Sequence, residues 1–324
     1  MRKFFKTALS VAGASLAACS GLGNQPSFSP SSAPAALRPL ASKYNVTPHP
    51  DRSRSWMDAR AKKGALLYLS DASTYDVYVY SWPSLALVGT LTGFNGPSGE
   101  CVDAKGNVWI ANTYDSELIE YAHGGTSPVA TLSDSGQYPY SCAVNKKSGT
   151  LAAGNIESTS GSAGSVTIYK RESGSGTNFP DSNVYVNFVG YDRRGNLFVD
   201  GGSGSGYFSL QTLRKGTFAP VTLSGGAIDI AGGVQYADKS LSVGDQLGES
   251  GNPVIYQMSE KGRITGSTRL DSGGCSQYAI AAGMVVCPDA KNRTIDVYSY
   301  PSGGTATQTL SGSFSDPFAA AISQ

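Results

Sequence analysis

The feature that most constrains this chain is a short segment that recurs six times. Each copy is an apolar run that ends in a small or polar residue. The copies are L-Y-L-S-D (67–71), V-W-I-A-N (108–112), L-A-A-G-N (151–155), L-F-V-D-G (197–201), L-S-V-G-D (241–245) and V-V-C-P-D (285–289). The last residues of successive copies are 41 to 46 positions apart. A unit repeated at this period indicates that each copy needs its neighbours to bury its apolar face.

Three further strands accompany each copy. A first strand precedes it, as in G-E-C-V-D-A-K-G (99–106), and the intervening turn has the Asp, Asn and Gly residues of a hairpin. A third strand such as D-V-Y-V-Y-S (76–81) and a weaker fourth strand such as Leu87 to Leu91 follow. Four strands at this period are typical of one propeller blade and leave no room for a substantial helix. The sequence therefore predicts an all-β chain with six four-stranded antiparallel blades.

The two ends of the repeat region predict how the ring closes. The C-terminal segment P-F-A-A-A-I-S (317–323) matches the first strand of a repeat, whereas Leu66 begins at a second strand. The C-terminal strand is therefore expected to complete the blade that Leu66 opens. Closure of this kind removes the long exposed edges of an open stack of sheets.

One copy resembles a known repeat. V-D-A-K-G-N-V-W-I-A-N (102–112) is similar to the NHL repeat, whose unit reads x-A-V-D-x-x-G-N-V-x-V-A-D. The resemblance covers about residues 60–324 and weakens in the fourth and fifth repeats. It implies a six-bladed β-propeller. Propellers of this kind include lyases, lactonase-like hydrolases and binding proteins, so the resemblance leaves the function open.

The N-terminus predicts export. A cationic start is followed by an apolar run, Thr7 to Ala18, which is too short to span a bilayer and has the form of a signal peptide. Leu16-Ala17-Ala18-Cys19 is similar to a bacterial lipobox, which implies that Cys19 carries a lipid after cleavage. The alternative is an ordinary signal peptide with a chance cysteine. Ser20 resembles the pattern of outer-membrane sorting, so we expect a lipoprotein of the outer membrane or cell surface.

Composition divides the chain into three parts. Residues 1–18 are the predicted signal peptide. Residues 19–54 are rich in Pro, Ser and Ala, show no period and are expected to form a disordered tether, because they cannot bury enough apolar surface to offset their ordering entropy. Residues 55–324 are the predicted propeller, expected to be monomeric.

The charge balance limits the classes of partner. The full sequence has 25 Lys and Arg against 24 Asp and Glu, and the loss of residues 1–18 removes three cations and no acids, which leaves a net charge of −2. This balance does not predict the clustered basic face that nucleic-acid binding needs. We therefore expect a protein or glycan partner in the cell envelope, no nucleic acid, and membrane contact through the N-terminal lipid alone.

Polar residues that end the second strands are the candidate ligand-binding residues. They would gather at one mouth of the channel, and Glu100 on a first strand is grouped with them. The candidates are Asp71, Glu100, Asn112, Asn155, Asp245 and Asp289. Carboxylates and amides suit Ca²⁺ or a polar ligand, but Asx side chains also form turns by bonding to nearby backbone N–H groups. Because the role recurs in nearly every blade, we favour turn formation.

No catalytic constellation is evident. The chain has only two histidines, which argues against a His-based zinc site, and it has no nucleophile elbow in a strand-to-helix context. We therefore predict no catalytic residues and no cofactor. A metal-assisted lactonase or lyase remains the alternative, with Ca²⁺ held by Glu100, Asn155 and Asp245 if their side chains converge across the channel.

Four cysteines remain after Cys19, namely Cys101, Cys142, Cys275 and Cys287, and three connectivities are open. In the repeat alignment Cys101 and Cys142 are one residue out of phase, so their side chains point to opposite faces of equivalent strands. Opposite faces of successive blades meet, which predicts a Cys101–Cys142 bridge between blades and leaves Cys275–Cys287 across one hairpin. The alternative is four buried thiols, but an oxidising compartment favours the bridges.

These observations predict a lipid-anchored envelope propeller that acts as a binding or scaffolding module for a protein or glycan.

Overall fold

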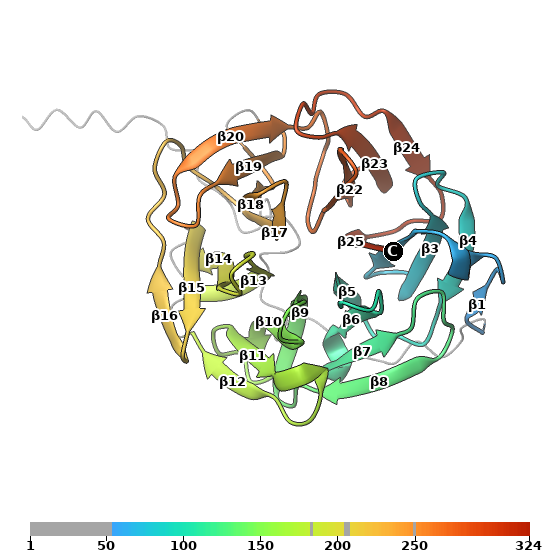
Figure 1. The fold of residues 1–324 in the computed structure, drawn as a ribbon, viewed down its shortest axis with the longest axis horizontal. Coiled ribbons are helices and arrows are strands. Elements are labelled where there is room, and N and C mark those ends of the chain that lie inside the picture. The colour runs from blue at the N-terminus through green and yellow to red at the C-terminus, as the bar shows by residue number, and fades with distance from the viewer. Residues whose placement is uncertain (1–53, 182–183, 204–207, 249–250) are drawn as a thin grey trace, which may run out of the picture. The chain divides into compact units, whose positions relative to one another are not determined.

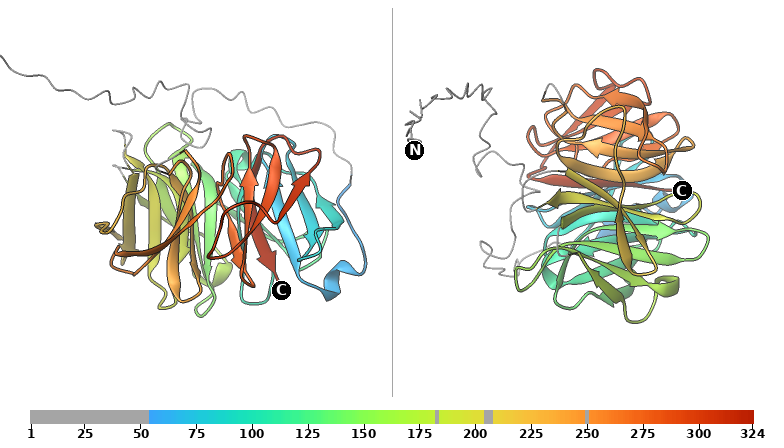
Figure 2. Two further views of the ribbon diagram at one scale, coloured as in Figure 1. Left: turned by 90° about the horizontal axis from the view of Figure 1, so that it is seen from above. Right: turned by 90° about the vertical axis from the view of Figure 1, so that its left-hand side faces the viewer.

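The computed structural model describes residues 54–181, 184–203, 208–248 and 251–324. Within them, six antiparallel sheets stand as blades around a common axis (Figure 1). Side views show that the strands run between the two faces of this ring (Figure 2). The predicted six-bladed β-propeller is confirmed. The predicted signal peptide, the lipid attachment at Cys19 and nearly all of the tether lie outside the described residues.

Five blades are each built from four consecutive strands, with the first strand innermost. Blade 2 contains β5 (Pro97–Val102), β6 (Val108–Asn112), β7 (Glu117–Tyr121) and β8 (Pro128–Ser133). Blade 3 contains β9 (Gln137–Asn145), β10 (Thr150–Ser158), β11 (Ser165–Tyr169) and β12 (Thr177–Pro180). Blade 4 contains β13 (Val184–Tyr191), β14 (Leu197–Ser203), β15 (Phe208–Arg214) and β16 (Thr217–Pro220). Blade 5 contains β17 (Ala231–Ala237), β18 (Ser240–Asp245), β19 (Val254–Met258) and β20 (Ile264–Arg269), and blade 6 contains β21 (Ala279–Ala281), β22 (Met284–Asp289), β23 (Thr294–Ser299) and β24 (Gln308–Ser311).

Blade 1 joins the beginning and the end of the ring. Its sheet order is β1 (Trp56–Met57), β4 (Leu87–Leu91), β3 (Asp76–Ser81), β2 (Leu66–Asp71) and β25 (Pro317–Ser323). The C-terminal strand β25 therefore pairs with β2, as the repeat alignment predicts. His123 supports this junction, because one ring nitrogen bonds to Ser323 Oγ at 2.6 Å and the other to the Gly64 carbonyl at 3.0 Å.

The core lies in the layers between neighbouring blades. Trp109, Tyr68, Tyr169 and Tyr298 are among the largest fully buried side chains, and they fill these layers as repeated aromatics are expected to do. Among the described residues, the helical elements are three short 3-10 turns, η2 (Ala61–Lys63), η3 (Thr113–Asp115) and η4 (Lys170–Glu172). None of the described helices is long and apolar enough to span a membrane.

Both predicted disulfides are present. Cys101 on β5 is bonded to Cys142 on β9, with 5.6 Å between their Cα atoms, and this bond joins blades 2 and 3. Cys275 is bonded to Cys287, with 5.1 Å between their Cα atoms, within blade 6. The one-residue offset between Cys101 and Cys142 turns their side chains toward each other across the interblade layer, which is the physical basis of the prediction.

Candidate functional site

In the turns after β5 and β13, the acidic side chain is buried and the Lys or Arg side chains are exposed. In the turn after β5, Asp103 is buried, and its Oδ1 accepts hydrogen bonds of 2.7 Å from the backbone N–H groups of Lys105 and Asn107. Gly106 provides the positive φ of 88° that this turn requires. The Asp103 carboxylate is thus held by the backbone, while the Lys105 side chain is exposed.

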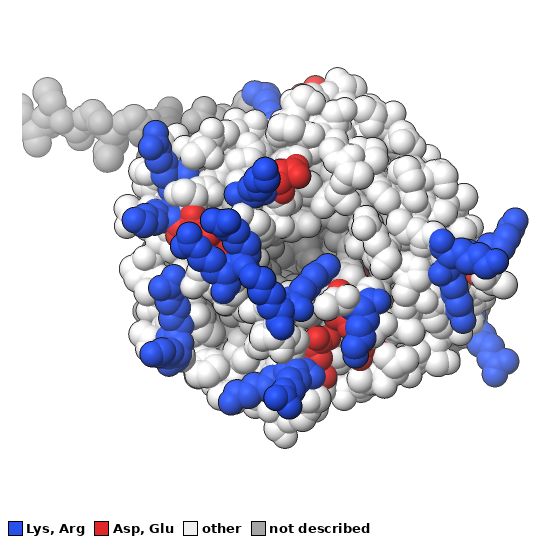
Figure 3. Space-filling model, viewed as in Figure 1, with Lys and Arg blue, Asp and Glu red and all other residues white. Residues whose placement is uncertain are grey.

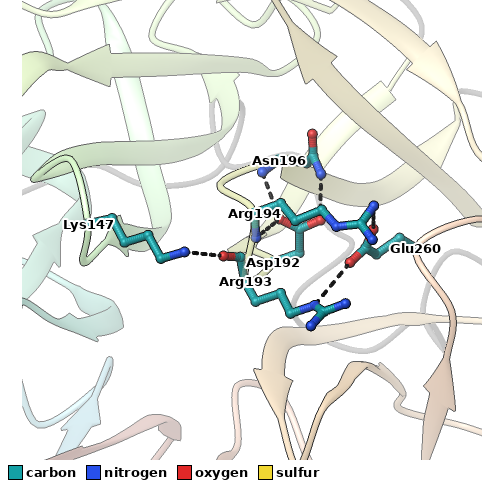
Figure 4. Close-up of polar contacts among 6 residues, drawn as sticks. All are labelled: Lys147, Asp192, Arg193, Arg194, Asn196 and Glu260. Atoms are coloured by element: carbon teal, nitrogen blue, oxygen red, sulfur yellow. Dashed lines mark hydrogen bonds and ion pairs between the residues drawn. The ribbon is translucent and has the colours of Figure 1, made fainter.

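Blade 4 repeats this arrangement. Asp192 is buried and accepts hydrogen bonds of 2.8 Å from the backbone N–H groups of Arg194 and Asn196, and the Asn196 amide donates to its second oxygen at 2.6 Å (Figure 4). The side chains of Arg193 and Arg194, which follow Asp192 in this turn, are exposed. The turn after β9 follows the same rule with an amide, because Asn145 Oδ1 accepts from the Lys147 N–H at 3.1 Å.

Because strands alternate in direction, the turns between first and second strands and between third and fourth strands share one face of the ring, which we call the hairpin face. Twelve of the fifteen Lys and Arg residues between positions 66 and 324 lie in these turns or at their ends, and all twelve are exposed. We call this set the basic crescent. It consists of Lys105, Lys146, Lys147, Lys170, Arg171, Arg193, Arg194, Arg214, Lys215, Lys239, Lys261 and Arg263.

The basic crescent spans blades 2 to 5 and surrounds a central hollow (Figure 3). Between positions 66 and 324, six acids share the hairpin face, and of these only Asp238 is exposed. Asp103 and Asp192 are buried, and Glu120, Glu172 and Glu260 are half-buried. Exposed charge on this face is therefore strongly positive although the whole chain is nearly neutral.

Contacts between blades organise part of the crescent (Figure 4). The Lys147 ammonium donates to the Arg193 carbonyl at 3.1 Å, which links blades 3 and 4. Glu260 in blade 5 lies 3.0 Å from Arg194 Nη1 and 3.9 Å from Arg193 Nε. Both arginine side chains remain more than 60% exposed, so these ion pairs orient the guanidinium groups while leaving them accessible.

A cavity of about 560 Å³ opens within the crescent, in the centre of the ring. Lys146, Lys147 and Arg193 are among its lining residues. Of the six residues predicted to surround the channel mouth, Glu100 alone lines this cavity. Asp71, Asn112, Asp245 and Asp289 end second strands, and Asn155 lies three residues before the end of β10, so these five lie toward the opposite face of the ring.

The predicted strand-end residues have partners in their own blades. Four of them bind the backbone of the segment that leads into the first strand of the same blade. The bonds run from the N–H of Ser315 to Asp71 (2.7 Å), of Asn95 to Asn112 (2.6 Å), of Asp229 to Asp245 (3.0 Å) and of Gly273 to Asp289 (2.8 Å). The Asn155 amide instead donates to Ser165 and Thr167 on β11, at 3.0 Å each. These side chains thus have structural roles, and ligand binding by them stays a prediction.

Glu100 differs from the other five. It is 2% exposed, and neither of its carboxylate oxygens has a hydrogen-bond partner. Desolvation by burial raises the pKa of Glu100 well above its ordinary value, because the charged form has lost water without gaining a donor. Burial therefore favours the protonated form of the Glu100 carboxyl group over the charged form.

The structure brings together a different group of acids. Carboxylate oxygens of Asp103, Glu120 and Glu172 lie within 4.8 Å of one another at the edge of the hairpin face. Asn107 Nδ2 donates to Asp103 at 3.2 Å and to Glu120 at 2.7 Å. Burial is the main cause that raises the pKa of Glu120, with smaller contributions from the neighbouring acids. This group shares no residue with the predicted Ca²⁺ ligands.

Comparisons with known proteins support the fold alone. No family model matches the sequence, and no curated protein matches it. A chain of a crystallised nidogen/laminin complex is similar in structure, with a TM-score of 0.65, 11% sequence identity, and coverage of 81% of this chain and 99% of that chain. A Bacteroides caccae protein of unknown function is also similar, with a TM-score of 0.61, 11% identity, and coverage of 81% and 100%.

The net charge of the sequence does not predict the basic crescent, because net charge contains no information on which turns hold the Lys and Arg residues. The signal is nevertheless present in the turns. D-A-K-G-N (103–107), N-K-K-S-G (145–149) and D-R-R-G-N (192–196) each place Lys or Arg between a turn-forming Asx residue and a glycine. Once these turns are assigned to one face of the ring, their Lys and Arg side chains are assigned to that face as well.

Proposed function

We propose that the protein is an exported binding module of the cell envelope, in which the basic crescent binds an anionic glycan. In this proposal Cys19 carries the lipid anchor and residues 19–54 tether the propeller to the membrane. The observation that supports the proposal is the gathering of twelve exposed cations around the channel on one face. The field of such a cluster adds up over the Debye length of about 8 Å and favours a polyanion over an isolated anion.

Surface composition favours a glycan over a folded protein. Protein interfaces are centred on buried aromatic or apolar residues. Among the described residues, the exposed large hydrophobic side chains are Trp56, Leu87 and Val129, which lie on the outer strands β1, β4 and β8 rather than in the crescent. The two disulfides are typical of an exported protein. The similar chain from the nidogen/laminin complex is a propeller crystallised with a binding partner, which is consistent with a binding role.

The test measures binding of the purified protein to polygalacturonate, a uronic acid polymer, with neutral dextran as the control polymer. The Lys147→Glu/Arg193→Glu variant reverses two charges of the crescent. The Lys291→Glu/Arg293→Glu variant makes the same change in the β22–β23 turn on the opposite face. We expect the crescent variant to lose at least tenfold in affinity and the control variant to stay within twofold of wild type.

Three outcomes would overturn the proposal. Equal binding of dextran and polygalacturonate would show that charge does not select the ligand. Equal losses in the two variants would show that the crescent is not the binding face. Single-stranded DNA bound more than tenfold more tightly than polygalacturonate would replace the glycan with a nucleic acid.

A further inference from the structure

Three aromatic side chains narrow the inner end of the cavity within the crescent. Tyr140 of blade 3, Phe188 of blade 4 and Phe318 of blade 1 contact one another across the axis of the ring. The ring centroids of Tyr140 and Phe318 are 4.6 Å apart, and those of Phe188 and Phe318 are 6.1 Å apart. Aromatic side chains from such distant blades can meet only by filling the channel. These rings therefore obstruct the channel on the side away from the basic mouth.

Gln277 lies beside these rings and links three blades. Its Nε2 donates to the Glu100 carbonyl, so the side chain reaches from the segment just before β21 in blade 6 to β5 in blade 2. Its backbone N–H also donates to the Phe318 carbonyl at 3.2 Å, and its carbonyl accepts from the Ala320 N–H at 3.0 Å. These bonds hold the side of the channel formed by blades 6, 1 and 2 in a fixed position.

The walls of the cavity offer hydrogen-bonding groups rather than a continuous apolar surface. β5, β9 and β13 are the end strands of their sheets, so their inner edges direct backbone donors and acceptors toward the axis. Small side chains such as Ala143 and Ala281 line the cavity and leave room beside these edges. The backbone N–H donors and C=O acceptors along such an edge can both bond to the hydroxyl groups of a sugar, because a hydroxyl group donates and accepts hydrogen bonds.

The mouth adds charge and aromatic surface. Tyr236 is half-buried near the end of β17 and lines the cavity, whereas Tyr191 at the end of β13 packs against the apolar layer between blades 3 and 4. Lys147 and Arg193 also line the cavity, and the Lys147 ammonium donates a hydrogen bond to the backbone carbonyl of Arg193. Tyrosines give an amphipathic contact surface, and the cations can bind a carboxylate or phosphate.

We infer that the channel binds the terminal unit of an anionic glycan, with the sugar ring between the strand edges and its acidic group at Lys147 and Arg193. The inference rests on the proposed function and narrows it, because it specifies a chain end rather than any stretch of polymer. The volume of about 560 Å³ lies in the range of small-molecule sites. The field of the crescent would guide the chain, and the channel would select its end.

The test uses small probes and a variant that fills the channel. Ala281 is half-buried and uncharged and lines the cavity at the end of β21, so Ala281→Trp reduces the channel volume and leaves the crescent charges intact. Titration calorimetry of the purified protein would compare glucuronate, glucose 6-phosphate, neutral glucose and trigalacturonate. We expect an acidic sugar to bind at least tenfold more tightly than glucose, and Ala281→Trp to weaken trigalacturonate binding at least tenfold. The preferred acidic sugar would distinguish a carboxylate ligand from a phosphate ligand.

A second measurement does not depend on the folding of the variant. Saturation-transfer NMR of trigalacturonate with the wild-type protein should show the strongest transfer at a terminal unit. Equal transfer to all three units, or equal trigalacturonate affinity in folded Ala281→Trp and wild type, would overturn the channel site. If polygalacturonate still binds and Lys147→Glu/Arg193→Glu still weakens it, only this inference fails. If no polymer binds, the proposed function fails as well.

Discussion

At the scale of single residues, the burial and hydrogen bonding of Asp103 and Asp192 are set by the turns in which they lie. Asp103 and Asp192 accept backbone hydrogen bonds within tight turns and are buried, whereas their neighbours Lys105 and Arg193 are exposed. Acids are thus withdrawn from the hairpin face while cations stay on it. A formal net charge of +1 for the whole sequence conceals this separation, since it counts buried and exposed groups alike.

Glu100 is the residue whose environment is least expected from the sequence. Its carboxyl group is buried without a donor, and it lies close enough to Tyr68 to contribute electrostatically to the raised pKa of that phenol, for which burial is the larger cause. A carboxyl with a raised pKa is neutral in the folded protein at a pH where it is ionised in the unfolded chain. Rising pH therefore favours unfolding through this residue.

This linkage predicts a pH-dependent gain in stability for Glu100→Gln. In the unfolded chain a glutamate ionises near pH 4.3, and the folded protein stays protonated well above that value. The free energy of unfolding of wild type should therefore fall by up to about 1.4 kcal/mol per pH unit above this point, and Gln does not titrate. Urea denaturation at pH 4, 5.5 and 7 should show the advantage of Glu100→Gln growing with pH.

Asp238→Asn gives the baseline for this experiment, because it removes one carboxyl group at an exposed turn. A Glu100→Gln difference that stays constant from pH 4 to pH 7, after subtraction of that baseline, would contradict a raised pKa of Glu100.

At the scale of elements, the Cys101–Cys142 disulfide joins two first strands that are not hydrogen-bonded to each other. β5 and β9 belong to different sheets, so packing and this bond hold them together. The bond closes a loop with a sequence separation of 41, against 12 for Cys275–Cys287. A longer loop restricts the unfolded chain more strongly.

We predict that the longer loop contributes more to stability. Cys101→Ala/Cys142→Ala should lower the free energy of unfolding by about 4 kcal/mol, and Cys275→Ala/Cys287→Ala by about 3 kcal/mol, on the chain-entropy estimate. Urea denaturation of both double variants would measure the two losses. A larger loss for the shorter loop would contradict this ranking, and four titratable thiols in the denatured wild type would contradict both bonds.

At the scale of the whole molecule, ring closure depends on one strand from the far end of the chain. β25 pairs with β2 along its length, from Leu66 opposite Ser323 to Asp71 opposite Pro317. Ala319, Ala320 and Ala321 are buried, and small side chains at these positions let β25 pack between β2 and the neighbouring blades. Without this strand the inner edge of β2 would be open, and an open edge promotes pairing with other chains.

Truncation after Asp316 should therefore remove more than one strand's contribution to stability. We expect a lower thermal midpoint, a broader transition and association on size-exclusion chromatography, because the ring can no longer close. Removal of Gln324 alone, beyond the end of β25, is the control and should leave a monomer with nearly wild-type melting. A monomeric truncated protein with the wild-type midpoint would show that closure does not stabilise the ring.

The sequence by itself determined the repeat, its four-strand unit and the C-terminal closure, and it favoured the disulfide pairing that the structure then showed. These follow from local patterns, since the period, the alternation of faces and the turn residues are properties of neighbouring positions. Only the tertiary structure decided where the exposed charges, the buried carboxyl groups and the central cavity lie. It directs Asp71 and Asp245 into backbone contacts, buries Glu100 between blades, and brings Lys147 and Arg193 from separate repeats to one mouth. These arrangements depend on how six distant segments face a common axis, which no single repeat encodes.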